Sequence, residues 1–145
     1  MPSNPRRPRP LSTAASLTPS ALATVVLILS QDAVAAALLG GLVETMGYDV
    51  RFARPPESFD RSLQRVRPRI CIVDCVNSEG CSDEFLGRAT MRGVSVIIYG
   101  TREALDKVRA LALQHQIDTL LMPAGPDELD AAFLRARDGD WEDAR

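Results

Sequence analysis

The sequence predicts a single α/β domain in which helices cover both faces of a parallel five-stranded sheet. Short runs rich in β-branched residues recur along the chain, and each run is followed by a segment with helical spacing. The runs TVVLIL, RICIVD and VSVIIY are apolar at successive positions, so both faces of each strand must be buried. Alternating strands and helices with doubly buried strands indicate a doubly wound (βα)5 architecture.

The elements follow one another in regular order. The five strands are expected to begin near Thr24, Tyr48, Arg69, Val94 and Asp118. The helices that follow show apolar residues at i, i+4 and i+7, such as Phe59, Leu63 and Val66; Leu105, Val108 and Ala112; and Leu129, Phe133 and Ala136. Pro126 suits the first turn of the last helix, where its missing N–H is not needed, and Asp127 and Glu128 favour the positive end of the helix dipole.

The first helix, expected at Asp32–Met46, is apolar almost all round. We expect its sheet-facing side to contain Val34, Leu38, Leu42 and Thr45. The outer side would then contain Ala36, Gly40 and Val43. Small, uncharged residues let a second helix approach closely, so we predict a partner face there. An ordinary surface is an equal alternative, because scattered exposed apolar residues are common.

Composition restricts the function. We expect residues 1–20 to form a disordered leader rich in Pro, Arg and Ser, residues 21–138 to form the domain, and residues 139–145 to form an acidic tail. A net charge of −2 argues against nucleic-acid binding. The apolar run after the leader resembles a secretory signal or a membrane span, but Gln31 and Asp32 interrupt it and a strand followed by a helix explains it better. We therefore expect a cytoplasmic protein without a membrane segment.

Neither a metal site nor a catalytic group is evident. The chain has three cysteines without CxxC spacing and a single histidine, which favours neither a zinc site nor a Cys/His or Ser/His/Asp arrangement. We expect no enzymatic activity and no cofactor.

The segment from Thr24 to about Arg137 resembles a response-regulator receiver domain, the phosphoacceptor module of two-component signalling. The resemblance rests on PRICIVD at residues 68–74, which resembles the strand that carries the acceptor aspartate. It rests also on IDTLLMPAGPDEL at residues 117–129, which resembles the last strand, its proline and the final helix. The resemblance implies a flavodoxin-like sheet in the strand order 2-1-3-4-5, with Asp74 at the phosphoacceptor position.

The same resemblance implies a degenerate phosphorylation pocket. The family's acid pair, which holds Mg²⁺ together with the acceptor, falls on Ser30 and Gln31, and Asp32 supplies a carboxylate only if its loop shifts. The hydroxyl that contacts the phosphoryl group falls on Gly100. Thr101 is adjacent, but we favour it as the N-cap of the following helix. The family's lysine falls on Met122, whose thioether cannot replace an ammonium.

Taken together, these residues favour an atypical receiver-like signalling module that acts by protein–protein contact, independently of phosphorylation. Because the first helix of receivers takes part in docking the kinase, the expected partner is a histidine kinase or another signalling protein, or a second copy in a homodimer. One alternative is a working phosphoacceptor in a phosphorelay, with Asp74 and Mg²⁺. A second is a flavodoxin-like small-ligand binder, against which the lack of a phosphate-binding loop argues.

Overall fold

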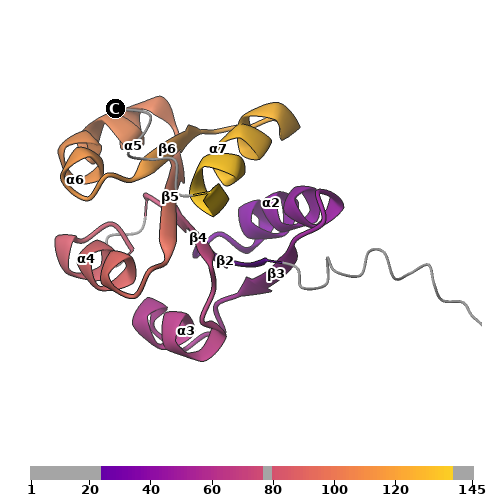
Figure 1. Ribbon diagram of the computed structural model, residues 1–145, viewed down its shortest axis with the longest axis horizontal. Helices are drawn as coiled ribbons and strands as arrows, with labels where there is room; N and C mark the ends of the chain where they lie inside the picture. Colours follow the sequence, from indigo (N-terminus) through magenta and orange to yellow (C-terminus); the bar gives the residue numbers. More distant parts are fainter. Residues whose placement is uncertain (1–23, 77–79, 139–145) are drawn as a thin grey trace, which may run out of the picture.

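The structure is a computed structural model that describes residues 24–76 and 80–138 (Figure 1). Its centre is a five-stranded sheet in the order β3-β2-β4-β5-β6, and all neighbouring pairs are parallel. The strands are β2 (Val25–Leu29), β3 (Asp49–Phe52), β4 (Ile70–Asp74), β5 (Ser95–Gly100) and β6 (Asp118–Leu121). With β2 counted as the first strand, this is the order 2-1-3-4-5, so the fold class expected from the sequence is confirmed.

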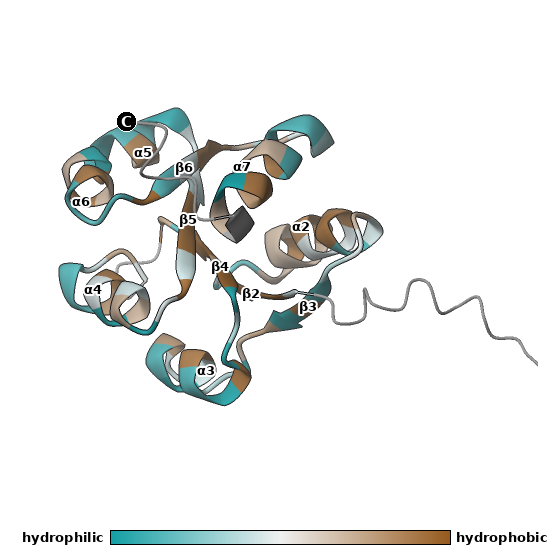
Figure 2. Ribbon diagram, in the orientation of Figure 1, coloured by the Kyte–Doolittle hydropathy of each residue, from teal (hydrophilic) through white to brown (hydrophobic). Residues whose placement is uncertain are grey.

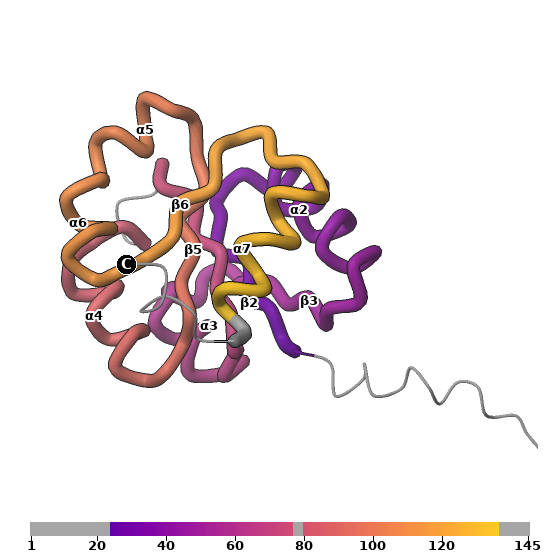
Figure 3. Tube along the Cα trace, turned by 45° about the horizontal axis from the view of Figure 1, so that its top comes forward, coloured from indigo at the N-terminus to yellow at the C-terminus, as the bar shows by residue number. Residues whose placement is uncertain are grey.

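Helices cover both faces of the sheet (Figures 1 and 3). One face is covered by α2 (Ala33–Thr45) and α7 (Pro126–Asp138). The other is covered by α3 (Phe59–Val66), α4 (Asp83–Met91), α5 (Arg102–Lys107) and α6 (Arg109–Gln114). Two hydrophobic clusters result, one on each side, and the strands contribute alternate residues to each of them. Phe133 of α7 and Phe85 of α4 are among the largest fully buried side chains.

Side-chain caps explain where several helices begin. Ser58 accepts the Arg61 N–H (3.1 Å) at the start of α3, and Ser82 accepts the Phe85 N–H (3.0 Å) at the start of α4. Thr101 accepts the Ala104 N–H (3.2 Å) at the start of α5. Each bond satisfies a backbone donor that the helix itself leaves open. The cap expected of Thr101 is therefore present.

The helix expected after Thr101 is interrupted at Val108. Its N–H bonds to the Leu105 carbonyl (3.1 Å), a tighter i to i−3 contact that separates α5 from α6. His115 ends α6 and its Nε2 lies 2.7 Å from Asp83 Oδ1, so this side chain connects α6 to α4. Neither proline nor glycine marks the interruption, and the sequence pattern continues through it.

The predicted phase of the first helix is wrong. Ala36, Gly40 and Val43, expected on the outer face, are buried against the sheet. Val34 and Leu38, expected on the sheet, are instead 69% and 73% exposed. Leu, Val and Ala occupy nearly every position before Glu44, so the pattern contains no polar side from which to fix the rotation (Figure 2).

The remaining domain predictions fall mainly outside the described residues. The leader (1–20) and the tail (139–145) lie in undescribed parts of the chain. The run that resembles a membrane span folds as β2 followed by α2. Within the described ranges, no helix combines the length and the apolar character needed to cross a bilayer.

Candidate functional site

Asp74 closes β4 at the carboxyl edge of the sheet, and hydrogen bonds already occupy its carboxylate. The residue is only 9% exposed. Its Oδ2 accepts the Ser30 hydroxyl at 2.9 Å, and its Oδ1 accepts the Val76 N–H at 2.9 Å. A buried carboxylate needs such donors because burial without them is costly. Two donors therefore hold the acid at the strand end.

Asp32 lies two residues after Ser30, but its carboxylate is directed to the start of α2 and not to Asp74. Its Oδ1 accepts the N–H groups of Val34 and Ala35, both at 3.1 Å, as the N-cap of α2. Its own N–H donates to Ser30 Oγ at 3.1 Å. The loop shift that would turn Asp32 toward Asp74 is not present, because this acid caps the helix.

A cysteine thiol fills the space beside Gly100. A Cβ placed on Gly100 would meet Cys75 Sγ at 2.3 Å, closer than real contacts allow. The Cys75 N–H donates to the Tyr99 carbonyl at 3.1 Å, which fixes the backbone of Cys75 next to β5. Burial and the nearby Asp74 charge raise the pKa of the thiol, so the neutral form is favoured. The volume that a hydroxyl side chain would use at position 100 therefore belongs to Cys75.

Two more of the expected pocket positions, Met122 and Thr101, supply no charge. Met122 is connected to the neighbouring strand by its N–H, which donates to the Gly100 carbonyl at 2.8 Å. Thr101 directs its hydroxyl to the helix N-terminus, as described above. Only Ser30, of the six degenerate positions, contacts the Asp74 side chain through a hydrogen bond in the described structure.

Tyr99 is a site residue that the sequence reasoning did not single out. It precedes Gly100 on β5 and pairs in register with Asp74. Burial and the charge of Asp74 raise the pKa of its phenol. Ser30, Asp74 and Tyr99 line a hollow of about 10 Å³, at the lower limit for one water molecule. The pairing of β4 with β5 places Tyr99 on the Asp74 side of the sheet, and the alternation within either strand alone does not show this.

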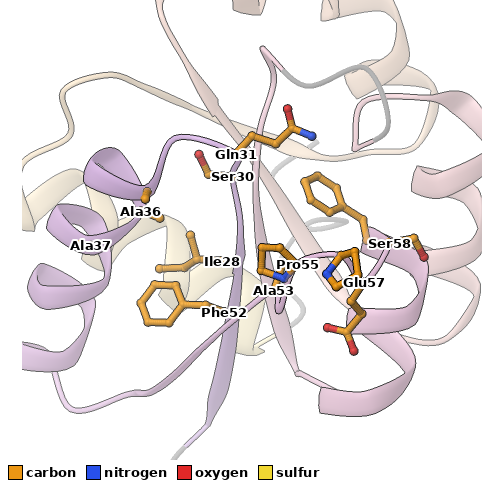
Figure 4. A pocket seen from close by; sticks show the side chains of 13 residues that line it. Ile28, Ser30, Gln31, Ala36, Ala37, Phe52, Ala53, Pro55, Glu57 and Ser58 are labelled. Carbon is orange, nitrogen blue, oxygen red and sulfur yellow. The ribbon is translucent and has the colours of Figure 1, made fainter.

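A larger hollow of about 870 Å³ lies beside the site, between α2 and the segment that joins β3 to α3. Figure 4 shows the Phe52 ring near Ile28 within it, with Ser30 and Gln31 at another part of its lining. Gln31 is exposed. Gln31 therefore belongs to this apolar hollow rather than to the hydrogen-bonded group at Asp74.

Glu57 fixes one wall of that hollow. Its carboxylate accepts hydrogen bonds from Arg65 (2.8 and 2.9 Å), from the Ser62 hydroxyl (2.7 Å) and from the Arg54 N–H (3.1 Å). These donors, above all Arg65, hold the pKa of Glu57 at about 2. The same guanidinium donates to the Phe52 carbonyl at 3.0 Å. No motif in the sequence indicated this network.

The residues around Asp74 do not fit Mg²⁺ as receivers hold it. Mg²⁺ requires near-octahedral oxygen ligands, several of them carboxylates or waters. Here one carboxylate, Asp74, faces the site, with the hydroxyl of Ser30 as its nearest side-chain neighbour. Across residues 24–76 and 80–138, no group of three or more His, Cys, Asp or Glu side chains is arranged to hold a metal ion.

Solved structures place this geometry in a known fold. The chain is similar to a response regulator receiver domain protein of Clostridium thermocellum at 18% identity, covering 81% of this chain and 96% of that one, with a TM-score of 0.64. The fold is that of a receiver domain. A signal receiver domain of a protein named as a LuxO repressor, from Vibrio parahaemolyticus, gives 21% identity, coverage of 83% and 95%, and a TM-score of 0.65.

A third structure, named as the pilus assembly protein CpaE of Burkholderia thailandensis, has 26% identity, coverage of 79% and 98%, and a TM-score of 0.63. No family model matches the chain, and a search of curated proteins finds no match. The receiver fold expected from the sequence is thus shown, and Asp74 lies at the strand end where the resemblance places the acceptor.

Proposed function

We propose that this chain is an atypical receiver module that acts through protein–protein contacts and not through phosphorylation of Asp74. The observation that carries the proposal is the state of the acid at the strand end. Asp74 is held by Ser30 and the Val76 N–H, while Asp32 caps α2. Phosphoryl transfer depends on positioning and countercharge, and neither a second free carboxylate nor a cation faces Asp74 among the described residues.

The working phosphoacceptor is the alternative to be excluded. Mg²⁺ and beryllofluoride, an acyl-phosphate mimic, are titrated into the labelled protein while NMR follows the amides of Asp74, Val76 and Gly100. We expect no saturable shift at millimolar Mg²⁺, whereas a receiver with a complete acid set shows one under the same conditions. Saturable shifts at these three amides would refute the proposal and establish the phosphoacceptor.

The outer face of α2 is the contact surface we propose. It consists of Ala33, Val34, Ala37, Leu38 and Gly41, all exposed. Exposed leucine and valine side chains on one helical face, with no charge among them, favour association with an apolar partner helix. This proposal keeps the partner helix expected from the sequence and corrects the residues that meet it.

Two leucine substitutions test this surface. Leu38 on α2 and Leu113 on α6 are 73% and 69% exposed, so a glutamate at either position is expected to change stability by no more than about 0.5 kcal/mol. Leu38→Glu would bury a carboxylate in the complex, at a cost of several kcal/mol. We expect Leu38→Glu to abolish partner cross-linking in the source cells and Leu113→Glu to preserve it. Equal losses from both variants would contradict the assignment of the surface to α2.

One comparison favours a more specific proposal about the partner. The structure with 26% identity is named as a pilus assembly protein, and 98% of it is covered by the match. We infer that the partner of this module belongs to a pilus assembly system. Deletion of the gene should then reduce the number of surface pili counted by electron microscopy, and complementation with the Asp74→Asn variant should restore them. Unchanged piliation after deletion would remove this candidate.

A further inference from the structure

A hollow with a basic rim lies at the amino-terminal edge of the sheet, opposite the Asp74 site. It measures about 510 Å³ and is lined by Leu63, Gln64, Arg67, Pro68, Arg92 and Val94. Leu63, Pro68 and Val94 are buried and form an apolar floor, whereas Arg67 and Arg92 are exposed at its rim. No acidic residue is among the lining residues. Such a hollow fits an aromatic side chain flanked by carboxylates.

The two arginines have no counter-ion in the described structure. Arg67 ends α3 and Arg92 ends α4. Neither guanidinium takes part in the ion pairs formed within residues 24–76 and 80–138. The last carbonyls of both helices also point toward this edge, where they can accept hydrogen bonds. An indole N–H, which only donates, complements such carbonyls, while carboxylates complement the guanidinium groups.

The end of α7 lies close to Val94, one of the residues that line this hollow. The Ser95 hydroxyl donates to the Ala136 carbonyl at 3.1 Å, so the end of α7 is attached beside Val94. Val94 and Ala136 line a shared smaller hollow of about 120 Å³, and Val94 also lines the basic one. The acid of the smaller hollow, Asp118, is already paired with Arg135 at 3.1 Å. A path therefore leads from the end of α7 to the two free guanidinium groups.

The residues beyond α7 have the complementary chemistry. The segment 139–145 reads GDWEDAR, in which Trp141 stands between Asp140 and Glu142. Trp141 is three residues beyond Asp138, a reach of about 10 Å in an extended chain. The other undescribed terminal segment, 1–23, reaches the same edge through Thr24, but its cluster at Arg6, Arg7 and Arg9 would be repelled by a basic rim.

We propose that segment 139–145 docks across the amino-terminal edge of the sheet, with Trp141 in the Arg67–Arg92 hollow and its flanking carboxylates on the two guanidinium groups. The segment then joins α7 to the ends of α3 and α4, on the opposite face of the sheet. A guanidinium over the face of a tryptophan ring is also attracted to it. This contact is independent of Asp74 and of the α2 surface.

Trp141 reports on the contact directly because the chain has a single tryptophan. Its fluorescence in the full chain is quenched with acrylamide, which is uncharged, so charge substitutions do not alter the quencher's own approach. We expect Trp141 to be shielded relative to the free peptide GDWEDAR. The Arg67→Glu/Arg92→Glu variant should reduce the ratio of docked to undocked chain about tenfold or more, because two attractions become repulsions.

Matched variants separate docking from general effects. Arg61→Glu makes the same charge change at an exposed position near the other end of α3 and should leave the quenching unchanged. By itself, the Asp140→Lys/Glu142→Lys variant should expose Trp141 to the quencher. Combined with Arg67→Glu/Arg92→Glu, it should restore the shielding, because the charges on both sides are then exchanged. Far-UV circular dichroism checks that every variant is folded.

Three results would overturn the proposal. The first is quenching of the full chain equal to that of the free peptide. The second is shielding that the Arg67→Glu/Arg92→Glu variant does not change, because the tryptophan would then lie elsewhere. The third is shielding that disappears when residues 1–20 are deleted, because the basic leader would then hold the tail.

Discussion

Gly40 and Gly41 are adjacent on α2, and the same Gly→Ala substitution is expected to stabilise the protein less at Gly40 than at Gly41. A Cβ on Gly40 would lie 2.6 Å from Phe52 Cζ and 3.1 Å from Phe52 Cε1. A Cβ on Gly41 would meet nothing within 4 Å. The two residues thus share a helix but differ in what surrounds them.

The magnitudes follow from two contributions. Replacing glycine by alanine inside a helix stabilises it by about 0.8–1 kcal/mol at either position. At Gly40 the added carbon must also displace the end of the Phe52 side chain, which is 42% exposed and has room to move, so the cost is that of an off-rotamer side chain, about 0.5–1.5 kcal/mol. The helix contribution cancels between the two variants. Gly41→Ala should therefore exceed Gly40→Ala in stability by about 0.5–1.5 kcal/mol, with Gly41→Ala above the unchanged protein.

Urea unfolding followed by circular dichroism measures both variants, with midpoints compared at constant m value. A Phe52→Leu background provides the control, because a smaller side chain removes the contact. In that background Gly40→Ala should become as stabilising as Gly41→Ala. Equal effects of the two alanines in the unchanged protein, or a difference between them that persists beside Leu at position 52, would refute the assignment of Gly40 to the sheet-facing side.

Three further expectations concern other parts of the molecule. Arg65 holds the pKa of Glu57 at about 2, below its usual 4.5, so the pair stabilises the fold at neutral pH and this contribution is lost as the pH falls from about 4.5 to about 2. Glu57→Gln should therefore lower the melting temperature at neutral pH. The difference in melting temperature between the variant and the unchanged protein should disappear on acidification. Gly100→Ala should destabilise the protein by about 1–3 kcal/mol, and Cys75→Ala in the same chain should recover most of this, as a double-mutant cycle in urea would show. Deletion of residues 1–20 should leave the melting temperature nearly unchanged, and a fall of many degrees in calorimetry would show that the leader packs on the domain.

The sheet could be predicted from the sequence because its signals are redundant. Apolar runs such as RICIVD are too short for helices and have no polar face, so they specify buried parallel strands. The strand order came from the resemblance and not from the pattern. In α3, charged residues such as Arg61 lie on the side away from the buried Leu63, and this amphipathic pattern fixes the rotation of the helix.

The parts that escaped prediction depend on three-dimensional neighbours. The rotation of α2 places Gly40 against Phe52 and Val50 of the neighbouring strand, and a helix of Ala, Leu, Val and Gly gives no polar side from which to infer it. The state of Asp74 depends on Ser30, which is 44 positions away in sequence. The Cys75 thiol, one residue beyond the end of β4, occupies the space beside Gly100 at the end of β5, and neither segment alone shows this. Hydrogen-bond geometry and side-chain volume across strands are thus the missing information.

If Asp74 is not phosphorylated, as we propose, control of the module must act elsewhere. A conformational switch needs an input that binds one of two states better than the other, and the ratio of the two affinities limits how far the populations move. In the proposed function, the Asp74 carboxylate keeps the Ser30 hydroxyl and the Val76 N–H as its partners and is not such an input. The bound fraction of its partner then depends on the concentrations of the two proteins and their dissociation constant. Cells would then set the strength of the signal by how much of each protein they make and degrade, and not by chemical modification of Asp74.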